Sequence, residues 1–268
     1  MTGGAETEQD QAKRHHQRTL FDGIADRYQQ ARPGYPAHIA DFIGATAGIG
    51  PGAAVLEVGC GTGQLTERLA YSSFRLTAID PGPAMVAAAR RRLADAGVRF
   101  EVTSFEELDA PEGSFDLVIS GTAFHWIDPA VAFAKPARLL RPGGWLALAD
   151  THEHYDDPLG AALDDLWVSH GDTGGAWERR PSDPAVIAAS GLFGPPARLD
   201  DRQRAVLPAA GVVALESTRA AFLTWPPQTQ RRFTADLSAL LGPAAAAGLT
   251  RHTSVTMAQA RRPQPQPG

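Results

Sequence analysis

Residues 55–63 of the chain read Val55-Leu56-Glu57-Val58-Gly59-Cys60-Gly61-Thr62-Gly63. A short apolar run leads into a turn with glycine at every second position, and a helical pattern follows from Leu65. Glycine lets bare backbone N–H groups approach a ligand that larger side chains would keep away. The stretch therefore predicts a strand, a ligand-binding turn and a helix. A tight strand-to-helix turn without a ligand is the alternative that this motif alone leaves open.

A carboxylate at the end of the next predicted strand indicates the class of ligand. Asp80 closes the run 76–80, where a carboxylate can accept hydrogen bonds from both hydroxyls of a ribose. A role as N-cap of the helix that Pro81 opens is the alternative, but it leaves the glycines unexplained. A dinucleotide-binding turn needs glycine at the sixth motif position, where this chain has Gln64. The pattern favours S-adenosylmethionine over NAD.

Strand and helix signals alternate outward from the turn. The strands are short continuous apolar runs, as expected when helices cover both faces of a parallel sheet. We expect strands at 54–58, 74–79, 98–102, 115–120, 144–149, 197–206 and 249–258, and helices near 20–32, 37–46, 65–71, 84–96, 130–140, 211–223 and 228–241. The predicted fold class is α/β, a doubly wound, seven-stranded, mostly parallel sheet with an antiparallel edge strand.

The predicted domain organisation is one domain with a lid. The domain spans 19–261, and its periodicity weakens over 151–195, which we interpret as an insertion that covers the substrate. Residues 1–18 and 262–268 lack apolar periodicity and are expected to be flexible tails.

Composition narrows the function classes. The 268 residues carry a net charge of -5, which is unfavourable for binding the phosphate backbone of a nucleic acid. The charge therefore favours a small-molecule substrate. Cys60 is the only cysteine, so an internal disulfide or a cysteine-based metal cluster is excluded. No apolar run approaches the 18 residues of a membrane span. We expect a cytoplasmic monomer or homodimer without a nucleic-acid or membrane partner.

The order and spacing of these segments resemble the class I S-adenosylmethionine-dependent methyltransferase superfamily. Within it, the chain is similar to the small-molecule branch with a generic methyltransferase domain, which includes trans-aconitate methyltransferase and its relatives. The similarity runs from Phe21 through Gly144 and more loosely to the terminal strand; residues 115–120 resemble the fourth strand and 139–144 the loop into the fifth. The resemblance implies a Rossmann-like sheet and methyl transfer to a small acceptor, with S-adenosylhomocysteine as product.

The resemblance also implies which residues bind the cofactor. The first motif, which holds the methionine part, is matched by Glu57, Gly59, Cys60, Gly61 and Gly63. Asp80 matches the ribose-binding acid, Pro81 and Met85 lie against the adenine, and Ser120 ends the fourth strand. The family often has an aspartate at the adenine amine where this chain has Ser104, so that contact would pass to the backbone at Phe105 or the side chain of Glu106.

An N-terminal group of residues resembles the family's helix that folds over the cofactor. Tyr28 and Arg32 are implied cofactor contacts, because a cation there could pair with the methionine carboxylate. The alternative is that Tyr28 is a core residue and Arg32 a solvated charge. Four aromatic residues are candidates for contact with the acceptor: Tyr35, Trp126, Tyr155 and Trp167.

Methyl transfer is an in-line displacement, so the enzyme must hold the acceptor and exclude water, and a general base is optional. His125 follows the fourth strand at the carboxyl edge of the sheet, where ligands of open α/β sheets bind, and a neutral histidine can accept a proton near pH 7. A packing or cofactor-lining histidine is the alternative. His154 is a second candidate. The polar run 152–157 could hold a metal, but the cofactor already supplies the electrophile, so no metal is expected.

Three rival functions remain. The first is an RNA or protein methyltransferase. A basic groove with interleaved aromatic residues would support it, but the negative net charge of the chain disfavours such a groove. A protein that binds S-adenosylmethionine without methyl transfer fits the motifs equally well, because every strong motif concerns the cofactor. An NAD-dependent oxidoreductase is disfavoured by Gln64.

Overall fold

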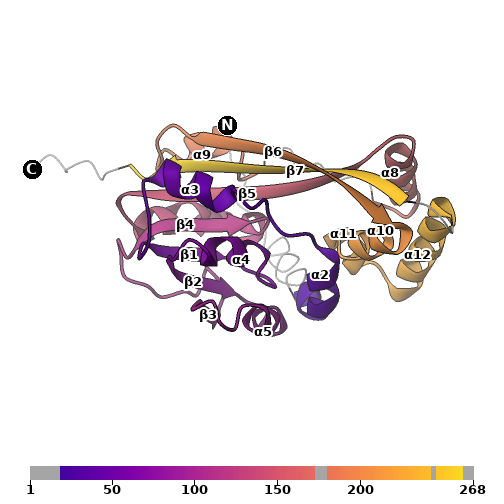
Figure 1. Cartoon of the computed structure of the whole chain (residues 1–268), viewed down its shortest axis with the longest axis horizontal. Coiled ribbons are helices and arrows are strands. Elements are labelled where there is room, and N and C mark those ends of the chain that lie inside the picture. The colour runs from indigo at the N-terminus through magenta and orange to yellow at the C-terminus, as the bar shows by residue number, and fades with distance from the viewer. Residues whose placement is uncertain (1–18, 173–179, 243–245, 262–268) are drawn as a thin grey trace, which may run out of the picture. The chain divides into compact units, whose positions relative to one another are not determined.

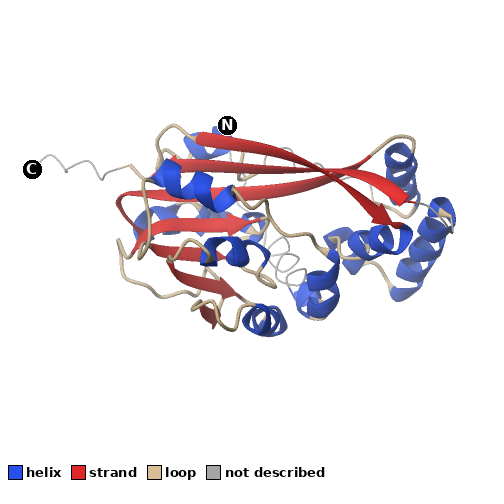
Figure 2. Ribbon diagram, viewed as in Figure 1, coloured by secondary structure: helices blue, strands red, loops and turns tan. Residues whose placement is uncertain are grey.

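The computed structural model describes residues 19–172, 180–242 and 246–261, and the two predicted tails lie outside this part of the chain. A seven-stranded sheet has the strand order β3-β2-β1-β4-β5-β7-β6 (Figures 1 and 2). The strands are β1 Ala54–Val58, β2 Arg75–Asp80, β3 Arg99–Val102, β4 Phe115–Gly121, β5 Leu140–Tyr155, β6 Ala197–Pro208 and β7 Ala246–Gln259.

The pairing of the strands is parallel from β3 to β5. Strand β1 pairs parallel with both β2 and β4, β2 with β3, and β4 with β5. Strand β7 runs the other way, because the Ala260 N–H donates to the Gly144 carbonyl (2.8 Å) while the Asp156 N–H donates to the Gly248 carbonyl (3.0 Å). The predicted seven-stranded, mostly parallel α/β sheet with an antiparallel edge is confirmed.

Helices connect the strands. They are α2 Ala25–Ala31, α3 Ile39–Ala47, α4 Gln64–Ala70, α5 Pro83–Arg92, the 3-10 helix η1 Phe124–Trp126, α6 Pro129–Ala132, α7 Ala134–Leu139, α8 Leu159–Ser169, α9 Pro184–Ala189, α10 Ala209–Glu216, α11 Ala220–Thr224 and α12 Pro227–Leu241. Helices α6 and α9 both start with proline behind a capping aspartate: Asp128 accepts from the Ala130 N–H and Asp183 from the Ala185 N–H, each at 2.8 Å.

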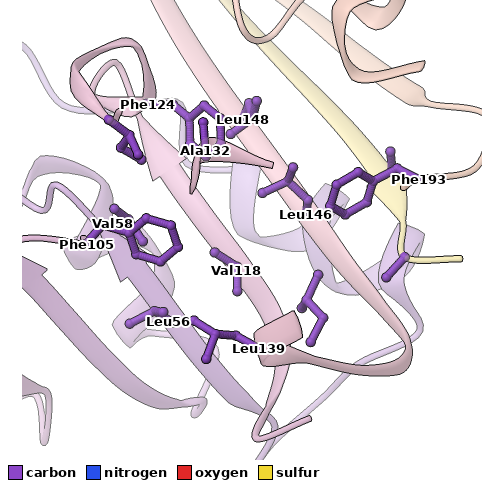
Figure 3. Packing of buried hydrophobic residues seen from close by; sticks show 14 of the residues in the cluster. Leu56, Val58, Phe105, Val118, Phe124, Ala132, Leu139, Leu146, Leu148 and Phe193 are labelled. Atoms are coloured by element: carbon purple, nitrogen blue, oxygen red, sulfur yellow. The ribbon is translucent and has the colours of Figure 1, made fainter. Parts of the chain in front are cut away.

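Alternate residues of the parallel strands face opposite sides of the sheet, and each side is covered. Leu56, Val118 and Leu146 point into one core together with residues of α6 and α7 (Figure 3). Their neighbours Val55 and Leu117 point into a second core together with residues of α3 and α4. Apolar side chains on both faces are the physical reason why these strands read as continuous apolar runs, and they make the sheet doubly wound.

The described residues form two compact units. The first takes residues 19–32, 153–172 and 204–250 and has its own core, in which Trp167, Phe222 and Phe233 are buried. The second takes residues 33–152, 180–203 and 251–261 and contains the glycine-rich turn. The predicted insertion is thus divided between the units. No helix in the described part of the chain combines the length and the apolarity needed to cross a bilayer.

Candidate functional site

The glycine-rich turn lies between β1 and α4 in the second unit. Gly59, Gly61 and Gly63 have φ values of 72°, 53° and 88°, a left-handed region that favours glycine. A Cβ atom on Gly59 would lie 2.4 Å from the Cβ of Ala123, whereas a Cβ on Gly61 would meet no atom of the described residues within 4 Å. Gly59 is therefore required by packing, and Gly61 leaves open space over the backbone for a ligand.

Asp80, at the end of β2, holds this turn in place. Its Oδ2 accepts a hydrogen bond from the Gly61 N–H (3.0 Å), and its Oδ1 accepts one from the Gly82 N–H (2.8 Å). Through the first of these bonds Asp80 stabilises the glycine-rich turn, a role that the sequence did not indicate. Carboxylate oxygens have further lone pairs, so the half-buried side chain can still accept hydrogen bonds from a ligand.

Glu57 is a buried acid one residue before the end of β1. Its side chain is 1% exposed, and its Oε2 has no hydrogen-bond partner among the described residues. Burial raises its pKa to about 8, and the negative charge of Asp80 adds to this rise. A buried carboxyl oxygen without a partner beside a ligand-binding turn fits the ammonium group of an amino acid, such as the methionine part of S-adenosylmethionine.

The adenine side of the predicted site is the loop 103–108, which follows β3. The Thr103 N–H donates to the Asp80 carbonyl (3.1 Å). The Ser104 hydroxyl donates to a carboxylate oxygen of Glu107 (2.7 Å), and Phe105 is buried. The Glu106 Oε1 accepts from the Asp128 N–H (2.9 Å), so this side chain ties the loop to the segment after η1. Met85 is buried on α5 and Pro81 is exposed before it.

Two other predicted cofactor residues make contacts within the protein. The buried Ser120 hydroxyl donates to the Val58 carbonyl (2.8 Å) and so joins β4 to β1. The Cys60 side chain is also buried, and burial raises the pKa of its thiol. Both side chains are buried, and a cofactor contact through them stays a prediction.

His125 lies in η1, directly after β4, and its ring centroid is 4.7 Å from that of Trp126. Burial lowers the pKa of His125 to about 4. The negative charge of Asp150 opposes this shift, and the positive charge of Arg180 lowers the pKa further. Arg180 contacts the Nε2 atom of His152, and the Ser182 hydroxyl contacts a carboxylate oxygen of Asp150. Sequence reasoning missed Arg180 and Ser182, since they lie in a weakly periodic stretch far along the chain from β5.

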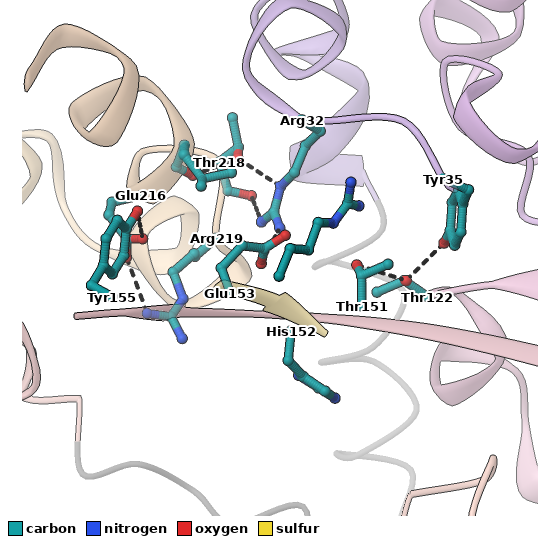
Figure 4. Close-up of polar contacts among 12 residues, drawn as sticks. Arg32, Tyr35, Thr122, Thr151, His152, Glu153, Tyr155, Glu216, Thr218 and Arg219 are labelled. Atoms are coloured by element: carbon teal, nitrogen blue, oxygen red, sulfur yellow. Dashed lines mark hydrogen bonds and ion pairs between the residues drawn. The ribbon is translucent and has the colours of Figure 1, made fainter. Parts of the chain in front are cut away.

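A chain of hydroxyl groups lies beside this histidine loop (Figure 4). The Tyr35 hydroxyl is 2.9 Å from Oγ1 of Thr122, which lies 3.4 Å from Oγ1 of Thr151. Thr122 has a φ of 52°, a strained conformation for a β-branched residue. The predicted substrate residue Tyr35 is thus buried against the end of β4, and its hydroxyl is engaged by Thr122.

The remaining predicted residues, Tyr28, Arg32, His154, Tyr155 and Trp167, belong to the first unit. Arg32 donates to the Thr218 hydroxyl (2.9 Å) and carbonyl (3.2 Å), and its guanidinium lies 5.5 Å from the centre of the Tyr28 ring. His154 is exposed. In the described residues, no group of three histidine, cysteine or acidic side chains could hold a metal ion.

A buried acid organises the same unit. The Glu216 carboxylate accepts from the Tyr155 hydroxyl (2.9 Å) and the Arg219 guanidinium (3.0 Å), as Figure 4 shows. It also accepts from the Trp167 indole N–H (3.0 Å). Burial and the charge of Glu216 raise the pKa of the Tyr155 hydroxyl. Tyr155 and Trp167 therefore already have polar partners inside the unit, and an acceptor contact through them stays a prediction.

Comparison with known proteins relates this site to a family. Residues 56–148 match a family model described as a methyltransferase domain. An uncharacterized methyltransferase of Mycobacterium tuberculosis is 37% identical over 130 residues, which cover 48% of this chain and 50% of that protein. A ubiquinone biosynthesis O-methyltransferase of Xanthomonas campestris pv. campestris is 38% identical over 146 residues, 50% of this chain and 61% of that protein.

The chain thus spans about half to three-fifths of the length of these curated relatives. A solved structure of a proposed type II methyltransferase from Anaeromyxobacter dehalogenans superposes with a TM-score of 0.61 at 23% identity and covers 86% of this chain and 99% of that one. That likeness shows the fold. Residues 56–148, which contain the glycine-rich turn, are thus similar to a methyltransferase domain, and the fold of the chain is that of a solved methyltransferase structure.

Proposed function

We propose that the chain transfers a methyl group from S-adenosylmethionine to a small-molecule acceptor. The observation that carries the proposal is the buried Glu57, whose Oε2 lacks a partner among the described residues, beside a turn where these residues leave open space over Gly61. When bound, the cofactor supplies an electrophilic methyl group on a positively charged sulfur. Glu57 would bind the ammonium group, Asp80 the ribose hydroxyls, and the backbone of the turn the remainder of the amino acid.

His125 would lie on the acceptor side. Because its pKa is about 4, the ring is neutral throughout the physiological pH range. A group with so low a pKa is a weak general base, so the ring contributes chiefly by accepting a hydrogen bond that orients an acceptor hydroxyl. Trp126, whose ring lies next to that of His125, and Arg180, whose charge lowers the pKa of His125, would shape the acceptor site, and His152 would join them through its contact with Arg180.

A small acceptor is favoured by two observations. The chain has a net charge of -5, which is unfavourable for holding a nucleic acid. One relative is named a ubiquinone biosynthesis O-methyltransferase.

The first unit would supply further contacts to the cofactor or the acceptor. The proposed residues are Tyr28, Arg32, His154, Tyr155 and Trp167. We also propose a cytoplasmic location, because the single cysteine is unpaired.

The test is calorimetric titration with S-adenosylmethionine, S-adenosylhomocysteine and NAD, followed by a screen of small-molecule extracts with methyl-labelled cofactor. We expect both sulfur compounds to bind, and Asp80→Asn to weaken their binding about tenfold through loss of a charge-assisted hydrogen bond. Asp95→Asn, at an exposed acid in the same unit, is the matched control and should bind like the native chain. Binding of NAD alone would contradict the proposal, and binding without transfer would leave only a cofactor-binding protein.

In the same assay, His125→Gln should lower kcat while the dissociation constant of S-adenosylhomocysteine stays unchanged. Because the pKa of His125 is about 4, the native kcat should show no inflection between pH 6 and 9 that His125→Gln removes. An inflection near pH 6.5 that disappears in the variant would show instead that His125 is an ordinary general base.

A further inference from the structure

Lys135, on α7, makes a set of contacts that the proposed reaction does not yet use. Its Nζ atom donates to the Glu106 carbonyl (3.0 Å) and to the Leu108 carbonyl (2.6 Å). The same Nζ atom lies 5.4 Å from the centre of the Phe105 ring. An ammonium group has three donors, and here two of them go to backbone carbonyls of one loop while the charge lies over an aromatic face of the same loop.

This loop, 103–108, follows the short strand β3 at the end of the sheet. Its local contacts give it a shape: the Ser104 hydroxyl and the Glu107 side chain bond each other, and the Leu108 N–H donates to the Ser104 carbonyl (3.0 Å). These bonds close a turn, but all their partners lie within the loop. The position of the turn relative to the rest of the second unit must come from other contacts.

Besides the bond of the Thr103 N–H to the Asp80 carbonyl and the buried ring of Phe105, those contacts come from the segment that follows the His125 loop. The Asp128 N–H donates to the Glu106 carboxylate (2.9 Å). The Lys135 ammonium donates to the Glu106 and Leu108 carbonyls, which lie on either side of Glu107. The Glu106 side chain is engaged by the Asp128 N–H and the Ser104 side chain by Glu107, so both have partners inside the protein. Recognition of an adenine edge would then depend on the loop backbone and on the remaining lone pairs of Glu106, and the position of these groups must be fixed by a neighbour.

We propose that Lys135 is a positioning residue for the adenine end of the cofactor, acting through the backbone of the 103–108 loop. This inference rests on the proposed function, since it assumes that the loop faces the adenine. Lys135 itself touches neither cofactor nor acceptor. It holds the loop carbonyls so that the remaining backbone groups lie where they can distinguish the amine-bearing edge of adenine from other purines.

The experiment compares Lys135→Met with the native chain in binding S-adenosylhomocysteine and S-inosylhomocysteine, in which an oxygen replaces the adenine amine. The native chain should prefer the adenine compound. Lys135→Met keeps an apolar stem but removes the ammonium, so the dissociation constant of S-adenosylhomocysteine should rise about tenfold and the preference for adenine should fall. Lys135→Arg keeps donors and charge and should restore part of the preference.

Arg138→Met is the matched control. Arg138 lies on the same helix, but its guanidinium faces Glu112 at 3.7 Å, so its loss should leave both dissociation constants unchanged. If Lys135→Met does not fold, Lys135→Gln, which keeps one donor group, replaces it. In the labelled-methyl assay, kcat at saturating cofactor should stay within about twofold for Lys135→Met while KM for the cofactor rises.

The outcomes separate the two proposals. Loss of affinity that is equal for both purines would mean that Lys135 only stabilises the fold, and an unchanged dissociation constant would remove its role altogether. A native chain that binds both purines equally would show that the loop does not read the adenine edge. If the native chain binds neither compound, the proposed function itself is wrong, and this inference is overturned with it.

Discussion

Folding and ligand binding favour opposite protonation states of the Glu57 carboxyl group. Burial favours its neutral form, as its pKa of about 8 shows, whereas an ammonium ligand favours the carboxylate. Between pH 4.5 and 8 the folded chain without ligand holds a proton that the unfolded chain has released. Binding of the cofactor near pH 7 should therefore expel this proton, and the observed binding enthalpy should depend on the buffer.

The same pKa predicts how stability depends on pH. Because the folded pKa of Glu57 is raised from 4.5 to about 8, its contribution to the free energy of unfolding is fully present below pH 4.5 and is lost as the pH rises through 8. The loss amounts to about 5 kcal/mol for a shift of this size. Glu57→Gln, which cannot ionise, should flatten the decline in chemical denaturation curves recorded from pH 5 to 9.

Glu112→Gln provides the control for this prediction, because the Glu112 side chain is 74% exposed. Its unfolding free energy should keep the native pH dependence. A Glu57→Gln variant that loses stability with rising pH as steeply as the native chain would show that Glu57 is already ionised near neutrality.

Residues of the site divide into those that the sequence could reveal and those that it could not. The positions of Glu57, Gly61 and Asp80 follow from a short motif and from the strand that comes next, so local pattern was sufficient. Lys135 and Ser182 contact residues 29 and 32 positions earlier in the chain. No motif marks such pairs, since their proximity results from the order of strands in the sheet.

At the scale of elements, the turn between β1 and α4 allows a direct test of the ligand space. Gly61→Ala and Gly97→Ala both place a Cβ at a positive φ, 53° and 67°, and in the described part of the chain neither Cβ meets an atom within 4 Å. Each should therefore cost a similar backbone strain of about 1–2 kcal/mol. Only Gly61→Ala should also weaken binding of S-adenosylhomocysteine, by about tenfold or more in calorimetry. Equal affinities in the two variants would place the ligand elsewhere.

The strands show where pattern recognition fails at this scale. The predicted fifth strand ended at Ala149, yet β5 continues to Tyr155 through the polar residues 150–154. An apolar run marks a strand that is buried on both faces, and these residues are only partly buried or exposed. The helix α8 likewise lies within the predicted insertion, where an 11-residue element was not anticipated. The core strands β1, β2 and β4 were predicted to within one or two residues, because helices cover both their faces.

At the scale of the whole molecule, the stability of the first unit should depend on Glu216. Removing this buried acid leaves three donors, from Tyr155, Trp167 and Arg219, without their acceptor. Glu216→Ala should lower the free energy of unfolding by about 3–5 kcal/mol, and Tyr155→Phe, which removes one hydrogen bond, by about 1 kcal/mol. Urea denaturation measures both.

Asp165→Ala is the control in the same unit. Asp165 is exposed on α8, so its loss should change the stability by less than about 1 kcal/mol. If Glu216→Ala unfolds no more easily than Asp165→Ala, the network around Glu216 contributes little, and the stability of this unit comes from its aromatic core.

Each of the two units is built from three separate stretches of chain, and the last stretch of each includes part of β7. Strand β5 ends at Tyr155 and β7 begins at Ala246, so at about 5–20 residues per second roughly 5–18 s separate the synthesis of the two strands. Throughout that interval the nascent chain carries β5 without its neighbour β7, as an open edge 16 residues long. On the ribosome, this edge is where a holding chaperone would be needed first.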